Sequence, residues 1–375
     1  MRSFTVAGKA YEAGGHALII AEIGTSHGGS LEKAKELVRA ARDSGADSCK
    51  FQMVLAREIL HPKTGVVPLP GGDIPLFDRF KELELPLDFY RELSDYCASQ
   101  GVMFLCSPFG PQSARDLASL HPPAIKIASP ELNHLTLLSE AARTGLPLIL
   151  SSGVSRLSDI ERALEATEST RSRLLLHCVT SYPAPEGEYN LRLLPSLSAL
   201  FGLPCGVSDH SLDATLVPAL SVAMGGVAIE KHISLSREDP GLDDPVALPP
   251  REFARMCEAV RLAAKEGGEE TLARYSAERG RDAVEAVLGD GIKKLAPSER
   301  ANYGRTNRSL HYLRDMKKGE RVTGADVAPL RTEKVLSVGL SPEWEGTVVG
   351  AILARDVEDG SGVSWDDLIP RLGPR

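Results

Sequence analysis

Side chains that can do chemistry recur along this chain at one kind of place, the end of a short apolar run. An apolar run followed by a polar turn is typical of a strand in a parallel sheet that is covered by helices. The residues found there, in chain order, are Glu22, Lys50, Gln52, Ser107, Lys126, Ser129, Ser151, His177, Tyr182, Ser208, Asp209, His210, Glu230, Lys231 and His232. One polar strand end needs no explanation, but a polar end on every run indicates a shared functional site.

Two of these residues are histidines at the ends of successive runs. His210 follows the seventh run and His232 ends the eighth, so neighbouring strands would bring both imidazoles to one ion. Two imidazoles with open coordination positions suit a divalent cation such as Mn2+ or Zn2+. A single histidine would more often be a core or helix-capping residue, but the pairing on adjacent strands favours a metal site.

Two lysines lie inside apolar runs. Lys50 is flanked by Cys49 and Phe51, and Lys126 lies between Ile125 and Ile127. Burial of an ammonium group is costly without an anionic partner, so both lysines are predicted to bind phosphate or carboxylate. The alternative is a surface lysine with a solvated head. A different functional alternative is a Schiff-base aldolase with a desolvated, nucleophilic Lys126.

Eight apolar runs separated by helix-period segments indicate the fold that must position these residues. The runs are 17–23, 48–52, 103–107, 124–127, 148–151, 174–178, 205–208 and 227–232. The segment 31–44 has apolar residues at a spacing of three and four, as in an amphipathic helix. Eight such units favour an α/β fold with a closed (β/α)8 barrel, in which the carboxyl ends of the strands meet at one face.

The rest of the chain predicts a lid, a linker and a second domain. A loop rich in proline and glycine, 54–85, follows the second strand and is expected to be a substrate lid. We expect a catalytic barrel over residues 1–265, ending in a helix at 250–264, and a polar linker with helical pieces over 266–305. Residues 306–375 are expected to form a small β-rich domain, with strand-like runs at 309–313 and 348–354.

Composition excludes several classes of protein. The formal net charge of −8 argues against a general nucleic-acid binder. The N-terminus lacks the apolar core of a signal peptide, and no later apolar run is long enough to span a bilayer. The six cysteines are scattered without a CxxC pair, which favours free thiols and a cytoplasmic protein.

Taken together, the motifs resemble the sialic acid (N-acetylneuraminate) synthase family, including its legionaminate, pseudaminate and spore-coat polysaccharide relatives. The strings that carry the resemblance are Ala21-Glu22-Ile23-Gly24, Lys50-Phe51-Gln52, Ser107-Pro108-Phe109, Lys126-Ile127-Ala128-Ser129, Leu150-Ser151-Ser152-Gly153, His177-Cys178 with Tyr182-Pro183, Ser208-Asp209-His210 and Glu230-Lys231-His232. They span residues 16–330 in register, and Asn307-Arg308-Ser309-Leu310 is similar to the start of the family's C-terminal antifreeze-like (SAF) domain.

The resemblance implies an activity and assigns roles to residues. It implies a metal-dependent condensation of phosphoenolpyruvate with an N-acetylated amino-sugar aldehyde, similar to N-acetylmannosamine, to give a nine-carbon 2-keto sugar acid and phosphate. His210 and His232 would hold the metal, with Mn2+ expected first and Mg2+, Co2+ or Zn2+ as alternatives. Phosphoenolpyruvate would be held by Lys50, Lys126, Ser129, Ser151 and Ser208. The sugar and the reaction centre would be lined by Glu22, Gln52, Phe109, Glu131, Tyr182 and Asp243.

The family also implies a domain-swapped homodimer in which an arginine of the SAF domain, here Arg331, covers the sugar of the partner chain. Several positions depart from the family pattern, namely Ser26, Gly28, Thr180, Ala247 and Thr332-Glu333. These departures affect sugar-contacting positions, whereas the metal and phosphoenolpyruvate positions are kept. A barrel that only binds a sugar acid, without catalysis, is the remaining alternative.

Overall fold

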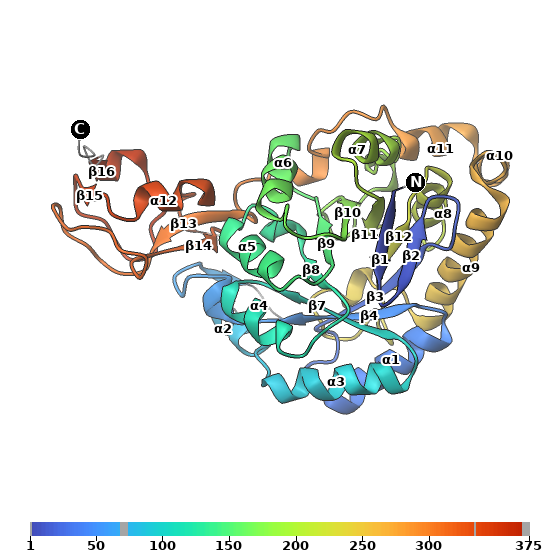
Figure 1. Ribbon diagram of the computed structural model, residues 1–375, viewed down its shortest axis with the longest axis horizontal. Coiled ribbons are helices and arrows are strands. Elements are labelled where there is room, and N and C mark those ends of the chain that lie inside the picture. Colours follow the sequence, from blue (N-terminus) through green and yellow to red (C-terminus); the bar gives the residue numbers. More distant parts are fainter. Residues whose placement is uncertain (1, 68–73, 334, 370–375) are drawn as a thin grey trace.

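The computed structural model describes residues 2–67, 74–333 and 335–369, in which eight parallel strands form a closed barrel beside a smaller C-terminal body (Figure 1). The barrel strands are β3 (Leu18–Gly24), β4 (Ser48–Met53), β7 (Met103–Pro108), β8 (Ile125–Ile127), β9 (Leu148–Ser151), β10 (Arg173–Cys178), β11 (Cys205–Asp209) and β12 (Ala228–His232). Around the ring each strand pairs with its neighbour in sequence, and β12 pairs with β3 to close it. The predicted (β/α)8 barrel is confirmed, and every strand overlaps a predicted run.

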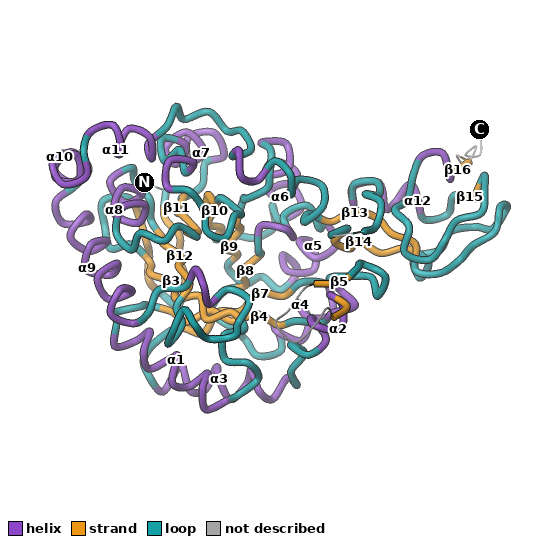
Figure 2. Tube along the Cα trace, turned by 180° about the vertical axis from the view of Figure 1, so that it is seen from behind, coloured by secondary structure: helices purple, strands orange, loops and turns teal. Residues whose placement is uncertain are grey.

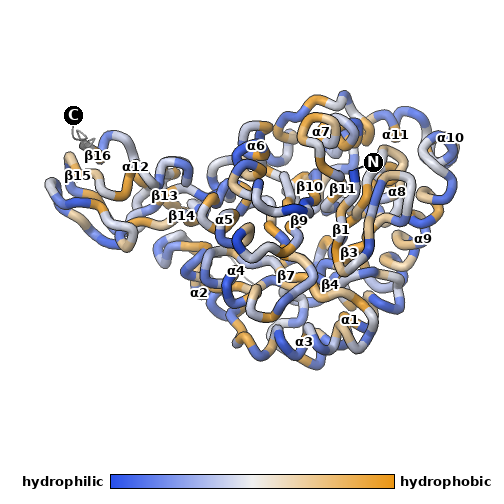
Figure 3. Tube along the Cα trace, viewed as in Figure 1, coloured by the Kyte–Doolittle hydropathy of each residue, from blue (hydrophilic) through white to orange (hydrophobic). Residues whose placement is uncertain are grey.

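Helices surround this barrel (Figure 2). They are α1 (Leu31–Asp43), α2 (Leu76–Lys81), α3 (Leu87–Ser99), α4 (Pro111–Ala118), α5 (Leu135–Arg143), α6 (Leu157–Ala166), α7 (Leu193–Phe201), α8 (Leu216–Ala223) and α9 (Pro250–Glu266). Helix α1 illustrates how the sequence forms them. The Ser30 side chain caps its first turn, Ala34, Leu37, Val38 and Ala41 are buried, and Gly45 follows its end at φ +98°. Apolar residues accordingly concentrate on the strands inside the ring of helices (Figure 3).

A hairpin that the sequence analysis did not predict closes the amino-terminal end of the barrel. Strands β1 (Ser3–Val6) and β2 (Lys9–Glu12) pair antiparallel. Phe4, Val6 and Tyr11 are buried in one cluster with residues from the first halves of the barrel strands. The barrel members of this cluster are Leu18, Ile20, Leu105, Ala124, Ile149, Leu174, Leu176 and Ala228. The lower barrel interior is therefore a dry apolar floor.

The loop after β4 has secondary structure of its own. It contains a short 3-10 turn at Ala56–Glu58, the two-residue strands β5 (Val66–Val67) and β6 (Ile74–Pro75), and α2. Part of the predicted lid, residues 68–73, lies outside the described residues. Val54, Ile59, Leu60, Leu76 and Phe109 form an apolar cluster beneath the loop.

The expected polar linker is mostly helical and packed. Helices α10 (Gly268–Arg279) and α11 (Arg281–Leu288) continue directly from α9. The Tyr275 hydroxyl donates to the Thr215 carbonyl at 3.3 Å, and the Leu191 amide donates to the Val287 carbonyl at 3.0 Å. Residues 289–296 lack regular secondary structure, a 3-10 turn follows at Pro297–Glu299, and residues 300–305 form further turns.

The C-terminal body is small and β-rich, as predicted. It contains β13 (Arg308–Tyr312), β14 (Val327–Arg331), α12 (Glu345–Val348), β15 (Ile352–Leu353) and β16 (Leu368–Ile369). The predicted run 309–313 corresponds to β13, whereas the run 348–354 contains the end of α12 and only a two-residue strand. A compact cluster that includes Leu310, Tyr312, Val327 and Leu353 forms its core.

Candidate active site

A ring of polar side chains lies directly above the apolar floor, at the carboxyl ends of the strands. Because side chains alternate along a strand, the residue two positions after a floor residue faces the same interior. This places Glu22 above Ile20, Ser107 above Leu105, Lys126 above Ala124, Ser151 above Ile149, and Glu230 above Ala228. All five are buried. Lys50 of β4 joins them, since its ammonium group lies against Glu22 and Ser107.

The two buried lysines share carboxylate partners inside the barrel. The Nζ atom of Lys50 lies 2.7 Å from Oε2 of Glu22 and 3.6 Å from Oε2 of Glu230. The Nζ atom of Lys126 lies 3.4 Å from Oε1 of Glu230. Both lysines are at most 3% exposed, which requires compensation by opposite charge. Glu230 was noted in the sequence only as a polar strand end, but it occupies the centre of this charge network.

The network drives the pKa values of its members apart. Burial lowers the pKa of Lys126, and the attraction of Glu230 does not fully offset that effect. For Lys50, burial acts in the same direction, but Glu22 and Glu230 outweigh it and raise the pKa. Burial raises the pKa of Glu230, but Lys126 and Lys50 outweigh it and lower the pKa to about 2. Lys50 and Glu230 are therefore charged at neutral pH, and Lys126 is the cation most easily deprotonated.

The serine hydroxyl groups around the lysines differ in whether they already have a hydrogen-bond partner. The Ser208 hydroxyl donates to Oε1 of Glu230 at 2.8 Å, and Oγ of Ser129 accepts from the Gly153 amide at 3.0 Å. The Ser151 hydroxyl is buried without a hydrogen-bond partner among the described residues. The backbone amides of this turn are occupied, since the Ser152 amide donates to the Leu176 carbonyl. An anion here would meet the side chains of the serines and lysines.

The two histidines lie side by side at the mouth of the barrel. The ring centroids of His210 and His232 are 5.4 Å apart, and the Tyr182 ring lies 4.2 Å from that of His210. Oδ2 of Asp243 lies 3.9 Å from Nδ1 of His232. Gln52 joins the lysine network, because its Nε2 donates to Oε1 of Glu22 at 2.7 Å. The structure thus brings these predicted residues together.

The donor set of this histidine pair fits a divalent metal ion. Nδ1 of His210 lies 2.9 Å from the Val179 carbonyl, which can only accept, so Nδ1 carries the hydrogen and the second proton, which a metal would replace, is on Nε2. A metal-binding histidine commonly donates its other ring N–H in this way. Burial lowers the pKa of His232 to about 3, so this imidazole is neutral. Burial opposes protonation of His210, but Cys178 raises its pKa to about 9, so a metal must displace a proton there.

The described residues hold no group of three His, Cys, Asp or Glu side chains arranged to bind a metal. If a metal binds here, the chain would supply the two imidazoles, and water or substrate would fill the other coordination positions. Such open positions are what a catalytic metal site requires.

Three further predicted residues form a separate cluster where the C-terminal body meets the barrel. Oε1 of Glu131 accepts from Arg331 at 2.7 Å and from Arg308 at 2.9 Å. The side chains of Glu131 and Arg308 are fully buried, and that of Arg331 is 11% exposed. The Arg331 guanidinium lies over the Phe109 ring, 5.6 Å from its centroid. Glu131 was predicted to line the substrate, but one of its oxygens holds the two arginines. Arg331 contacts Glu131 of its own chain. Burial raises the pKa of Asp243, and the charge of Arg331 only partly opposes that rise.

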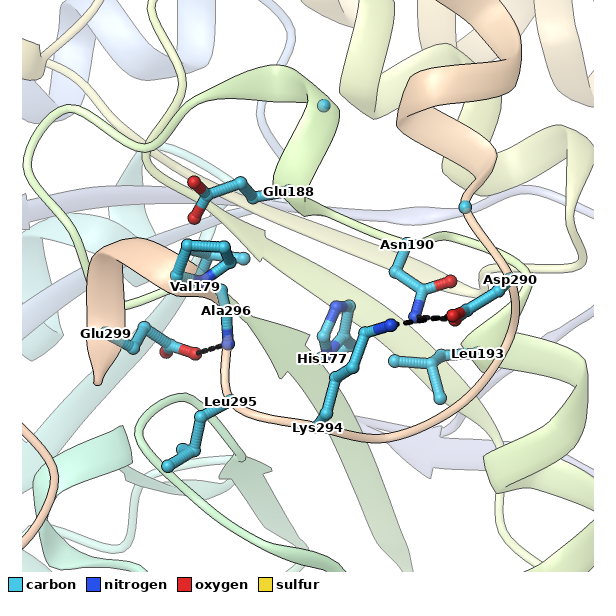
Figure 4. Close-up of a pocket in the computed structure, with 13 residues that line it drawn as sticks. His177, Val179, Glu188, Asn190, Leu193, Asp290, Lys294, Leu295, Ala296 and Glu299 are labelled. Carbon is cyan, nitrogen blue, oxygen red and sulfur yellow. Dashed lines mark hydrogen bonds and ion pairs between the residues drawn. The ribbon is translucent and has the colours of Figure 1, made fainter.

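Some polar strand ends face away from the site. Lys231 and Asp209 form an ion pair of 2.6 Å outside the ring of strands. The Lys231 ammonium group also donates to the Ser211 carbonyl. His177 points outward into a cavity of about 260 Å³ between β10 and residues 289–299 (Figure 4). These three residues have structural partners, and strand alternation in the sequence would have separated them from Ser208 and Glu230.

The departures from the expected motifs have structural roles as well. The Ser26 hydroxyl donates to Asp244 near the histidines. Ala247 and Thr332 are buried, and the Thr332 hydroxyl lies 2.9 Å from that of Ser309. The Thr180 amide donates to the buried carboxylate of Glu299.

A closed (β/α)8 barrel with buried lysines, acids and a histidine pair at the carboxyl ends of its strands is the framework of a barrel enzyme for anionic small molecules. The NeuB family profile matches residues 37–271, and the SAF domain profile matches residues 307–369. The chain belongs to the NeuB family, and its C-terminal body is a SAF domain. The resemblance found in the sequence is thereby confirmed.

Individual relatives agree over nearly the whole chain. The spore coat polysaccharide biosynthesis protein SpsE of Bacillus subtilis is 32% identical, covering 100% of this chain and 99% of SpsE. The N,N'-diacetyllegionaminic acid synthase of Legionella pneumophila is 31% identical, covering 93% of this chain and 94% of that protein.

Solved structures agree as well. The crystal structure of SpsE has a TM-score of 0.82 at 31% identity, covering 98% of this chain and 99% of that one. The N-acetylneuraminic acid synthetase of Leptospira borgpetersenii has a TM-score of 0.65 at 28% identity, covering 80% of this chain and 95% of that one.

Proposed function

We propose that this chain condenses phosphoenolpyruvate with an N-acetylated amino-sugar aldehyde, similar to N-acetylmannosamine, to give a nine-carbon 2-keto sugar acid and phosphate. The observation that carries the proposal is the pair of buried lysines, Lys50 and Lys126, beside the unpartnered hydroxyl of Ser151. Phosphoenolpyruvate carries two anionic groups on a small skeleton, and two fixed cations at the floor of a barrel match that charge pattern. The relatives named as legionaminic acid and sialic acid synthases support the same substrate class.

The proposal includes a divalent metal held by His210 and His232, with Mn2+ first and Mg2+, Co2+ or Zn2+ as alternatives. When bound, such a metal supplies Lewis acidity toward an aldehyde oxygen. Tyr182 and Asp243 border the same place, so both are proposed to orient the sugar.

The bonds made and broken follow from the substrates. The C3 carbon of phosphoenolpyruvate bonds to the aldehyde carbon, and a water oxygen bonds to C2. The bond between C2 and the phosphate oxygen then breaks, phosphate leaves, and the water oxygen becomes the keto oxygen. Of the two protons of that water, one ends on the former aldehyde oxygen and the other leaves with phosphate or solvent.

Residues of this chain are placed to assist these changes. Lys50 and Lys126 stabilise the negative charge of the carboxylate and of the departing phosphate. Glu22 is held on both sides, by Lys50 and by Gln52, and is proposed to move a proton from the attacking water toward the former aldehyde oxygen.

We further propose a cytoplasmic homodimer in which the SAF domain of one chain covers the barrel of the other. All six cysteines are free and buried, which suits a reducing compartment. Among the described residues no helix is long and apolar enough to cross a membrane. Domain swapping exchanges identical elements between chains, so the contact of Arg331 with Glu131 can form within one chain or between two.

The direct test is mass spectrometry of the products formed from phosphoenolpyruvate with a panel of N-acetylated hexosamines and Mn2+. We expect a 2-keto sugar acid with three more carbons than the sugar, together with equimolar phosphate. If folded protein gives no product with any of these sugars and any of the four metals named above, the proposed reaction is wrong. The remaining alternative is then a barrel that binds a sugar acid without catalysis.

A second candidate, a Schiff-base aldolase, is supported by one observation, the lowered pKa of Lys126. A lysine that deprotonates easily is a better nucleophile. Against this candidate, Glu230 lies 3.4 Å from the Lys126 ammonium group, and this carboxylate favours the charged form of Lys126.

A further inference from the structure

Glu299 is a buried carboxylate that the proposed chemistry does not use. It lies in the 3-10 turn Pro297–Glu299, after the barrel is complete, and is only 1% exposed. In the part of the chain that the structure describes, no lysine or arginine forms an ion pair with it. Its partners are backbone amides: Oε1 accepts from Val154 and from Thr180, both at 2.7 Å, and Oε2 accepts from Ala296 at 3.2 Å. Figure 4 shows this carboxylate beside Ala296 at the edge of the outer cavity.

The two amides held by Oε1 belong to different loops of the active site. Val154 follows β9 and lies three residues after Ser151, whose hydroxyl is free for a ligand. Thr180 follows β10 and lies two residues before Tyr182, whose ring centroid is 4.2 Å from that of His210. Hydrogen bonds from amides to a buried carboxylate are stronger than those between neutral groups, so one oxygen ties the two loops together.

The loop after β9 needs such support. Val154 has a φ of +40°, and a β-branched residue in the left-handed region is strained. Strained backbone persists only when its surroundings hold it. Glu299 holds the amide of Val154, and Nδ2 of Asn307, at the start of the SAF domain, donates to the Val154 carbonyl at 3.0 Å.

The two loops are also packed without space to adjust. A Cβ atom on Gly153 would lie 2.0 Å from Oγ1 of Thr180 and 2.9 Å from Oγ of Ser129. A shift of either loop therefore moves the other, and with it the hydroxyl of Ser151.

We propose that Glu299 is a positioning residue that holds the loops after β9 and β10 where Ser151 and Tyr182 meet the substrates. The inference deepens the proposed function and rests on it for the identity of the substrates. It makes the segment after the barrel a part of the active-site architecture.

The test compares Glu299→Gln with Glu188→Gln. Gln keeps the volume of Glu299 and can keep an oxygen at the position of Oε1, but it removes the negative charge that strengthens both loop hydrogen bonds and turns its N–H groups toward the Ala296 amide. Glu188 borders the same cavity and accepts from the amide and hydroxyl of Ser298 at 3.0 and 2.6 Å, but it accepts from neither the Val154 nor the Thr180 amide. We expect Glu299→Gln to raise the KM for phosphoenolpyruvate about 10- to 100-fold, as for other residues that orient a ligand-binding side chain, and Glu188→Gln to leave it unchanged.

Hydrogen exchange provides a readout that does not depend on the reaction. In Glu299→Gln, peptides covering 151–155 and 179–182 should exchange faster than in Glu188→Gln. Asn307→Asp replaces the Nδ2 donor that binds the Val154 carbonyl, so hydrogen exchange should become faster in 151–155 only. This variant also tests the hold on the loop after β9 if Glu299→Gln does not fold. Equal exchange and equal KM in the Glu299 and Glu188 variants would overturn the inference. If the wild type neither binds nor turns over phosphoenolpyruvate, the proposed function fails, and the exchange data still decide whether Glu299 holds the loops.

Discussion

At the scale of single residues, the two buried lysines are not equivalent. Lys50 has two carboxylate partners, Glu22 at 2.7 Å and Glu230 at 3.6 Å, whereas Lys126 has only Glu230, at 3.4 Å, among the described residues. Groups whose environments separate their pKa values can take separate roles in one site. Lys50 serves as a permanent cation, and Lys126 is the cation whose charge depends on pH.

This difference predicts an alkaline limit for phosphoenolpyruvate binding. The folded pKa of Lys126 is lowered, so as pH rises this group loses its charge before an ordinary lysine does. Glu230→Gln removes the carboxylate that partly offsets burial, which lowers the pKa further. We expect the loss of affinity to begin at a lower pH in this variant than in the wild type, measured by calorimetric titration across alkaline pH. The remote variant Glu188→Gln should follow the wild type, and a shift to higher pH would contradict the assignment.

Lys126 is expected to act as a charge and not as a nucleophile. Borohydride added during turnover should trap no covalent adduct, because the ammonium group is paired with Glu230 and forms no imine. Peptide mass spectrometry is the measurement. A stable mass increase on the Lys126 peptide would instead establish the Schiff-base aldolase.

The histidine pair predicts dependence on a metal. Treatment with a chelator should abolish turnover, and Mn2+ or a similar divalent ion should restore it. His210→Ala and His232→Ala should each lower metal affinity, measured by titration of the metal-free protein, while leaving the barrel folded. Full turnover in metal-free buffer would show that these imidazoles serve another purpose.

At the scale of elements, the N-terminal hairpin fills the lower barrel. Phe4 is fully buried in the floor cluster, and truncation of a buried phenylalanine costs about 3–5 kcal/mol. Phe4→Ala should lower the free energy of unfolding by this order in urea titration. Leu200→Ala, at a residue that is 59% exposed on α7, should change it by only about 0.5 kcal/mol. Equal effects of both changes would mean that the hairpin contributes little.

The strands could be predicted from sequence because each is an uninterrupted apolar run, which parallel strands between a packed interior and helices require. Their alternation also carries the direction of each side chain. Counting in twos from Ala228 places Glu230 inside the barrel, and counting from Leu174 places His177 outside it.

Other features have no local pattern. The hairpin is too short and too polar on its exposed face to stand out, since only Phe4, Val6 and Tyr11 turn inward. Arg331 and Glu131 are 200 residues apart, and Glu299 and Val154 are 145 apart. Contacts at such separations follow from the closed barrel and the docking of the C-terminal segment, so they cannot be deduced from periodicity or composition.

At the scale of the whole molecule, the SAF domain docks through buried charge. Arg308 is fully buried and donates to the Glu58 carbonyl at 2.6 Å and the Phe109 carbonyl at 2.8 Å, besides its bond to Glu131. His61 in the loop after β4 lies 3.0 Å from Asp359 of the SAF domain. The docked domain thus holds the loop that follows β4.

A mixing experiment tests the proposed exchange of domains between chains. Arg331→Ala and Lys126→Ala should each be nearly inactive alone, because each lacks one part of the same site. In a mixed swapped dimer one site regains both residues, so activity should partly return. Subunit exchange is verified by mass spectrometry, and each variant mixed with itself is the control. Background activity despite verified exchange would place Arg331 on its own chain.

The N-terminal hairpin packs over the amino-terminal end of the barrel, so we expect ligands to enter at the carboxyl ends of the strands. Under the proposed reaction, phosphoenolpyruvate lies beside the lysines, just above the apolar floor, and the sugar lies nearer the histidines at the mouth of the barrel. A bound sugar would then block the path of phosphoenolpyruvate, so the kinetics should be ordered, with phosphoenolpyruvate first. Sugar in excess should in that case slow the enzyme by occupying an otherwise empty barrel.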